Sequence, residues 1–200
     1  MKDMKYTLLN NDIKMPMLGL GTYLNEDYVE LKNCINSAID MGYRHFDTAS
    51  YYDNESQIGQ IIKENPIKRE ELFITTKLWN SDHGYEKTLK AFNDSLKKLK
   101  TDYVDLYLVH WPNPVHNETW RAMEKLYNEG NGKAIGVCNY NIRYLKDIME
   151  NSDVVPALNQ IEFHPHLIQD DLMNYCSGHN IQVEAWAPLM RGGIFNIELL

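Results

Sequence analysis

The sequence has few cysteines and no long apolar run. Its three cysteines (Cys34, Cys138 and Cys176) lie far apart, and none belongs to a CxxC pair. This sparse, odd set predicts free thiols in a reducing compartment, the cytoplasm, rather than a disulfide-stabilised secreted domain. No apolar run approaches the length of a membrane-spanning helix, and the first residues show no secretion signal. We therefore expect a protein with no membrane partner.

Basic residues are also scarce. Lys and Arg number 20 against 28 Asp and Glu, which gives a net charge of -8 with both signs mixed along the chain. Without a broad basic face, binding to a nucleic-acid backbone is not expected. The 200 residues are 44% hydrophobic, enough for one ordinary globular domain over residues 1–200. An anionic ligand would have to be held by individual cations or backbone N–H groups.

Short apolar runs alternate with stretches of helical spacing after a predicted N-terminal hairpin (Tyr6–Leu9 and Ile13–Met15). The predicted strands are Met17–Gly21, His45–Thr48, Leu72–Lys77, Val104–His110, Ala134–Cys138, Ala157–Glu162 and Gln182–Trp186. The predicted helices are Tyr28–Met41, Glu55–Glu64, Glu86–Lys98, Glu118–Glu129, Ile142–Glu150 and Gln169–Ser177. Such alternation indicates a parallel sheet built from βαβ units.

Two α/β architectures are compatible with this order, an open doubly wound sheet and a closed (β/α)₈ barrel of the TIM type. The segment Gly19-Leu-Gly21 lacks the third glycine of the phosphate-binding turn that an open sheet normally carries. Polar residues end four successive strands at intervals of about 30 residues, one βαβ period each: Asp47, Lys77, His110 and Asn139. In a barrel these residues converge on the C-terminal rim, where barrel enzymes build their active sites.

These residue types favour proton transfer to a carbonyl oxygen. Lys77 near the carboxylate of Asp47 is expected to stay charged, and such a cation is expected to lower the pKa of the nearby phenol of Tyr52. A phenol with a lowered pKa would donate a proton near neutral pH, while His110 would orient the substrate oxygen. Each feature has a structural alternative: Asp47 and Lys77 alone could be a buried ion pair, and His110 a core histidine.

Six segments resemble the aldo-keto reductase superfamily in order and spacing, from Met15 to the last residue. They are Gly42-Tyr-Arg-His-Phe-Asp47-Thr-Ala-Ser-Tyr-Tyr52-Asp-Asn-Glu55, Ile74-Thr-Thr-Lys77-Leu-Trp79, Leu108-Val-His110-Trp-Pro112, Gly136-Val-Cys-Asn139, Asn159-Gln160-Ile-Glu and Glu184-Ala-Trp186-Ala-Pro-Leu189. The resemblance is to the bacterial and protist type similar to prostaglandin F synthase and 2,5-diketogluconate reductase. It implies reduction of a small-molecule carbonyl by hydride from NADPH (NADP+ as product), or from NADH.

The resemblance also implies a role for particular residues. Tyr52 would be the proton donor, completed by Asp47, Lys77 and His110. Asn139 and Gln160 would bind the nicotinamide carboxamide and Trp186 would lie beneath the ring, with further cofactor contacts from Gly21, Thr22, Asp47, Cys138, Ala187 and Leu189. Tyr23, Trp79, His110 and Trp111 would line the substrate pocket. Cys138 departs from the serine of many members, and its thiol is a weaker hydrogen-bond donor.

No metal site is expected. His164-Pro-His166 is the one candidate, but a proline separates the two histidines and no third ligand is near in sequence.

Seven barrel strands are counted rather than eight, and Arg191–Leu200 is expected to begin the next helix. By resemblance, the eighth strand and the basic residues for the cofactor's adenosine end would follow. Weak cofactor binding and association through exposed sheet edges are therefore expected. Two functions stay open, a working carbonyl reductase and a catalytically impaired fragment or non-catalytic barrel with a binding role. Oligomeric state is undetermined.

Overall fold

The computed structural model describes residues 4–196 of the chain. Its strands are β1 (Tyr6–Leu8), β2 (Lys14–Pro16), β3 (Gly19–Gly21), β4 (His45–Asp47), β5 (Phe73–Leu78), β6 (Leu106–Val109), β7 (Ile135–Cys138), β8 (Leu158–Glu162) and β9 (Gln182–Trp186). Its α-helices are α1 (Tyr28–Asp40), α2 (Glu55–Glu64), α3 (Tyr85–Leu99), α4 (His116–Asn128), α5 (Ile142–Glu150) and α6 (Asp170–Gly178). Short 3-10 helices lie at Ser50–Tyr52, Arg69–Glu71, Asn80–Asp82 and Met190–Asn196.

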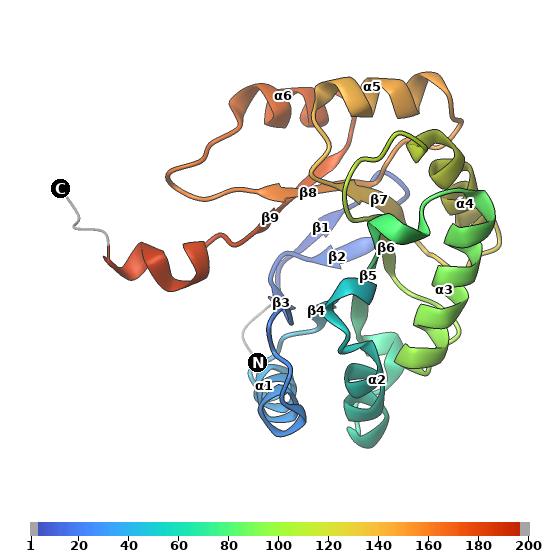
Figure 1. Ribbon diagram of the computed structural model, residues 1–200. Helices are drawn as coiled ribbons and strands as arrows, with labels where there is room; N and C mark the ends of the chain where they lie inside the picture. Colours follow the sequence, from blue (N-terminus) through green and yellow to red (C-terminus); the bar gives the residue numbers. More distant parts are fainter. Residues whose placement is uncertain (1–3, 197–200) are drawn as a thin grey trace.

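Seven of these strands form one parallel sheet in sequence order, from β3 to β9. The sheet curls on itself into a nearly closed barrel of the (β/α)₈ type, with the helices along its outside (Figure 1). The predicted fold class, the helical spans and the seven parallel strands are thus confirmed within residues 4–196. The predicted hairpin is confirmed as the antiparallel pair β1 and β2.

Alternation along each strand separates two cores. On β6, Tyr107 and Val109 point outward and pack against the helices, whereas Leu106 and Leu108 point into the barrel. The outer core is the larger one and includes fully buried helix residues such as Leu31, Ile58 and Phe92. Because the side-chain period of a strand is two, His110 continues the inward series just beyond β6.

The N-terminal hairpin closes one end of the barrel. Leu9 and Met15 pack with the inward residues Phe73, Leu106 and Leu158. Asn11 in the hairpin turn donates to the carbonyl of Lys133, just before β7, over 2.9 Å. The hairpin therefore covers the N-terminal ends of the strands, and the opposite rim stays free for a site.

Two segments depart from the expectations. Met17 and Leu18 precede β3 as an exposed segment rather than extending it, at 65% and 54% exposure. Residues 190–196 form a 3-10 segment interrupted by left-handed Arg191 and Gly192, so the helix expected to begin at Arg191 is irregular over that part. Residues 197–200 lie outside the described residues. Across residues 4–196, no helix is both long and apolar enough to cross a bilayer.

Candidate active site

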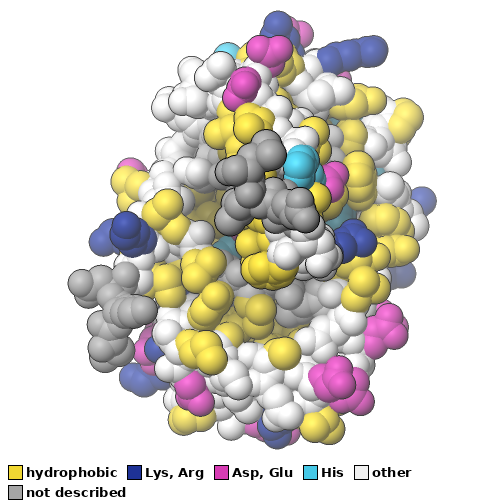
Figure 2. Space-filling model, turned by 90° about the vertical axis from the view of Figure 1, so that its left-hand side faces the viewer, with side chains coloured by type: hydrophobic (Ala, Val, Ile, Leu, Met, Phe, Trp, Pro, Cys, Tyr) yellow, Lys and Arg dark blue, Asp and Glu magenta, His cyan; other side chains and the backbone are white. Residues whose placement is uncertain are grey.

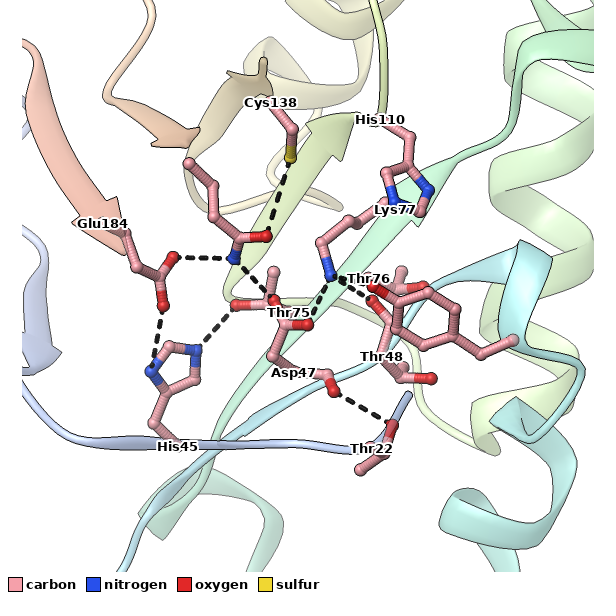
Figure 3. A network of polar contacts seen from close by, with 12 residues as sticks. Thr22, His45, Asp47, Thr48, Thr75, Thr76, Lys77, His110, Cys138 and Glu184 are labelled. Atoms are coloured by element: carbon pink, nitrogen blue, oxygen red, sulfur yellow. Dashed lines mark hydrogen bonds and ion pairs between the residues drawn. The ribbon is translucent and has the colours of Figure 1, made fainter. Parts of the chain in front are cut away.

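Polar side chains from six neighbouring strands meet inside the C-terminal half of the barrel. Asp47 ends β4, Lys77 lies near the end of β5, and Cys138 ends β7. Their alternation partners Phe46 and Val137 belong to the outer core, so the polar residues must face inward. Figure 3 shows Lys77, Asp47, Cys138 and Glu184 converging from separate strands. The predicted convergence on one rim is confirmed.

The ammonium group of Lys77 is hydrogen-bonded to several neighbouring residues at once. Lys77 is fully buried and donates hydrogen bonds to Asp47 Oδ1, to the carbonyl of Thr48 (3.0 Å) and to the hydroxyl oxygen of Tyr52 (3.3 Å). A buried ammonium is costly unless its three hydrogens are satisfied, and here all three have acceptors. Burial lowers the pKa of Lys77, but the Asp47 carboxylate together with Tyr52 and Cys138 raises it by more in sum, so the pKa lies above its usual range. Lys77 is therefore charged, as expected.

The loop that carries Tyr52 is fixed by side-chain hydrogen bonds on both sides. Ser50 donates to the carbonyl of Lys77 over 2.9 Å. Asn54 accepts from Thr48 over 2.7 Å and donates to the carbonyl of Thr22 over 2.9 Å. The Tyr52 ring is consequently held against the barrel rim, with its oxygen accepting from Lys77. Its own hydrogen is left available for a group in the cavity.

The expectation of a lowered phenol pKa is wrong in its net direction. Burial raises the pKa of Tyr52 above its usual value, and the charge of Lys77 lowers it only in part. The phenol is poorly solvated, which penalises the tyrosinate more than one neighbouring cation can offset. Tyr52 is therefore protonated at neutral pH and held next to the cation that would stabilise its conjugate base.

His110 lies at the same point as a neutral imidazole. Burial, followed by the charge of Lys77, lowers its pKa to about 3. Its ring packs edge-on against Tyr52 and Trp79, with centroid distances of 5.7 and 5.2 Å. Its Nδ1 atom is buried without a hydrogen-bond partner among the described residues. A neutral imidazole can donate one hydrogen bond without carrying charge.

A cavity of about 840 Å³ opens above these groups. Its lining includes ten of the residues expected for catalysis, substrate or the nicotinamide end: Gly21, Tyr23, Asp47, Tyr52, Trp79, His110, Trp111, Asn139, Gln160 and Trp186. Ala187 also lines it. The cavity also extends along the side of the barrel between β3 and β9, where it is lined by exposed Met17 and Leu18, and Leu24 lines it after β3. Figure 2 shows hydrophobic side chains on this face. The cavity therefore combines an apolar entrance with a polar floor, as ligand sites commonly do.

Four expected residues lie behind the cavity surface or beside it. Lys77 is fully buried under Tyr52 and Asp47. Thr22 is buried and donates to the carbonyl of Asp47 over 3.0 Å. Cys138 is fully buried, and its sulfur lies 3.9 Å from Gln160 Oε1. Leu189 is 53% exposed on the loop after β9 and is absent from the cavity lining.

The side-chain amides of the two residues expected to bind the carboxamide differ in which hydrogen-bonding groups remain available. Asn139 accepts from the indole of Trp186 (2.9 Å) and donates to the carbonyl of His110 (3.0 Å). Gln160 donates to Asp47 (2.9 Å) and to Glu184 (3.0 Å), and its oxygen faces the weak donor Cys138. Asn139 keeps one amide hydrogen, and Gln160 keeps an acceptor oxygen.

Residues 17–198 match the aldo/keto reductase family. The chain belongs to this family. It is 48% identical over 193 residues to the glyoxal reductase of Bacillus subtilis, covering 96% of this chain and 70% of that protein.

Solved reductases share the fold. An aldo/keto reductase from Brucella melitensis superposes with a TM-score of 0.90 at 48% identity, covering 94% of this chain and 74% of that one. A Bombyx mori aldo-keto reductase in complex with NADP superposes with a TM-score of 0.88 at 37% identity, covering 92% of this chain and 66% of that one. The chain thus spans about two thirds to three quarters of the length of these relatives.

Three cavity residues of this reductase were not singled out from the sequence. Tyr51 stacks on Trp79 with ring centroids 3.9 Å apart. Arg191 lies over the ring of Tyr23 at 5.7 Å. Glu184 adds a second carboxylate to the floor of the cavity. An acidic residue within the largely apolar run Gln182–Trp186 was a usable signal for Glu184, since a partly buried carboxylate requires a partner.

No group of three or more potential metal ligands lies together within residues 4–196. His164 Nε2 lies 3.6 Å from Glu162 Oε1, and its Nδ1 accepts from the backbone N–H of His166 over 3.3 Å.

Proposed function

We propose that this chain reduces the carbonyl group of small aldehydes and ketones to an alcohol, with the proton supplied by Tyr52. The observation that carries this proposal is the contact of the Tyr52 hydroxyl with the buried ammonium of Lys77, on the floor of an 840 Å³ cavity. A phenol in this position can donate its hydrogen to an oxygen in the cavity while Lys77 stabilises the negative charge left behind.

The other groups prepare this proton transfer. Asp47 keeps Lys77 charged and in place, because each charge offsets the cost of burying the other. His110, as a neutral imidazole, donates a hydrogen bond that orients the carbonyl oxygen. After transfer, the proton of Tyr52 resides on the product hydroxyl, and the tyrosinate regains a proton from solvent through the open cavity. Tyr23 and Trp79 form apolar walls beside the reacting group.

The residues of the cavity fit a nicotinamide cofactor, which would supply the hydride when bound. Gln160 offers an acceptor oxygen and Asn139 an amide hydrogen, the complement of a carboxamide. Trp186, fixed by its bond to Asn139, would offer its indole face, with Gly21 and Ala187 in the lining of the same cavity. We propose NADPH, because the Bombyx mori relative is solved with NADP, and NADH as the second candidate.

The substrate we propose is a small reactive carbonyl of the glyoxal type. The similarity to the glyoxal reductase supports this class, and the aromatic rim of the cavity favours compact molecules. We place the protein in the cytoplasm; within residues 4–196 its three cysteines are all free, as expected in a reducing compartment.

The test is consumption of NADPH, and separately of NADH, with glyoxal, methylglyoxal and a ketone as substrates. Stoichiometric appearance of the alcohol supports the proposal. Binding of a cofactor without turnover on any of the carbonyls contradicts it and favours a non-catalytic barrel with a binding role. Absence of both binding and turnover contradicts both functions.

A further inference from the structure

Glu184 lies directly beside Gln160 inside the barrel. The two residues are register partners on β8 and β9, so their side chains leave the sheet on the same face. Both line the cavity, and the side chain of Glu184 is 19% exposed. Figure 3 shows Glu184 on the far side of Asp47 from Lys77. Glu184 has no part in the proton transfer proposed above, and a second carboxylate this close to Asp47 requires an explanation.

The amide of Gln160 is held between the two carboxylates. Its Nε2 donates to Asp47 Oδ2 over 2.9 Å and to Glu184 Oε2 over 3.0 Å, which uses both amide hydrogens. A rotation of the amide by half a turn would place its oxygen against two carboxylate oxygens with no hydrogen between them. Oxygen-to-oxygen contacts of this kind are repulsive, so the orientation of the amide is determined by its partners.

His45 lies on the other side of Glu184. His45 Nδ1 lies 3.9 Å from Glu184 Oε1, and its Nε2 contacts the hydroxyl of Thr75 at 3.0 Å. The ring of His45 lies directly against the backbone of Gly19, where an added Cβ would meet Nδ1 at 2.6 Å. The carboxylate of Glu184 therefore lies between the amide of Gln160, which donates to it, and the ring of His45.

We infer that Glu184 is a positioning residue which, together with Asp47, fixes the amide of Gln160 so that its carbonyl oxygen accepts from the carboxamide NH₂ of the nicotinamide cofactor. This inference rests on the proposed function. The fixed oxygen has only the buried thiol of Cys138 as a partner, at 3.9 Å, so it is available for a stronger donor. Asn139 supplies the matching amide hydrogen, and the two side chains together distinguish the two ends of a carboxamide.

The experiment is a double-mutant cycle on NADPH affinity, measured by quenching of intrinsic tryptophan fluorescence and repeated with NADH. Glu184→Gln keeps the size and shape of the side chain, but the new amide can either accept from or donate to the amide of Gln160. Gln160→Met removes the amide of residue 160 altogether. We expect Glu184→Gln to raise the Kd about five- to tenfold in the wild-type background and less than about twofold in the Gln160→Met background. Glu162→Gln, on the same strand as Gln160 but paired with His164, is the matched control with an unchanged Kd.

The outcomes separate this inference from the function beneath it. If the wild-type chain binds a cofactor and Glu184→Gln binds it equally well, the inference fails alone. Equal weakening in both backgrounds also overturns it, because Glu184 would then act independently of Gln160. No binding by the wild-type chain overturns the proposed function and the inference together. Glu184→Met, which removes the acceptor, replaces Glu184→Gln if the latter melts below the assay temperature, with the same expected ratios.

Discussion

The ammonium nitrogen of Lys77 lies 3.3 Å from the hydroxyl oxygen of Tyr52, although the two residues are 25 positions apart in the chain. One comes from the end of β5 and the other from the loop after β4, and adjacent parallel strands bring them together. The contact exists because Asp47 and Thr48 supply the remaining acceptors that a buried ammonium needs. Loss of any one partner should therefore affect the others.

Substitution of Lys77 by Met should cost both stability and activity. It leaves the carboxylate of Asp47, whose side chain is 12% exposed, without its compensating charge. We expect the free energy of unfolding to fall by about 3–5 kcal/mol, the usual consequence of breaking a buried ion pair, as measured by urea unfolding. The double variant Asp47→Asn with Lys77→Met removes both charges and should recover part of that loss. A double variant no more stable than Lys77→Met would show that the ion pair is not the cause.

The pH dependence of carbonyl reduction should follow the protonated phenol. Burial raises the pKa of Tyr52 above its ordinary value of about 10, so the proton donor is present throughout the neutral range. We expect kcat for reduction to be level through neutral pH and to fall only in strongly alkaline solution. Oxidation of the alcohol needs the tyrosinate and should become faster as pH rises. The range from pH 7 to pH 8 lies roughly two to three units below the ordinary pKa of a phenol. A reduction rate that already falls by half across this range therefore contradicts this assignment.

Acid should destabilise the fold through His83. This residue is 6% exposed, and neither ring nitrogen has a partner among the described residues. Burial, followed by His116, lowers its pKa to about 4, whereas an unfolded chain has about 6.5. Below pH 6.5 the unfolded state therefore binds a proton that the folded state excludes, and stability falls as pH falls toward 4. The slope is about 1.4 kcal/mol per pH unit for one such group.

His83→Leu removes that proton-binding group and should make the decline between pH 6.5 and pH 4 shallower by about this amount. His110, with a pKa lowered to about 3, contributes a similar slope that the substitution leaves in place. The measurement is denaturant unfolding at a series of pH values. An unchanged slope in the variant would show that His83 titrates normally in the folded protein.

Tyr51 should set the size of carbonyl that enters. Its ring covers Trp79 at 3.9 Å, and the pair forms one wall of the cavity. Tyr51→Ala removes that cover, so we expect kcat/KM for benzaldehyde to rise about tenfold relative to that for glyoxal. Tyr51→Phe keeps the stacked ring and should keep the wild-type preference. If Tyr51→Ala leaves the ratio of kcat/KM for benzaldehyde to that for glyoxal unchanged, Tyr51 does not limit the size of the substrate.

The positions of the strands and of the central site were predictable from the sequence because both follow from local pattern. Asp47, Lys77 and His110 each end or follow a buried run, and parallel strands must deliver such ends to one rim. The inward direction of each side chain follows from the two-residue period. The helical boundaries were recovered to within two residues, since each helix carries one apolar face toward the sheet.

The energetic balance at the site was not predictable in the same way. Lys77 does lower the pKa of Tyr52, but the extent of burial decides the net direction and depends on packing by the loop at Ser50–Tyr52. The hydrogen-bond partners of the two amides were also not predictable. The indole of Trp186 donates to Asn139, and Glu184 contacts Gln160 only because of the register between β8 and β9. Such contacts join residues from different strands, so the local sequence pattern does not identify the partner.

The most direct test of Tyr52 as the proton donor compares two tyrosine variants in the same assay. Tyr52→Phe removes the hydroxyl that contacts Lys77, whereas Tyr28→Phe removes a hydroxyl on the outer helix α1 that contacts Glu64. We predict that Tyr52→Phe lowers kcat for NADPH-dependent reduction of glyoxal at least about 100-fold with little change in cofactor affinity, and that Tyr28→Phe reduces at the wild-type rate. A Tyr52→Phe variant that retains more than about a tenth of the wild-type kcat would contradict the account.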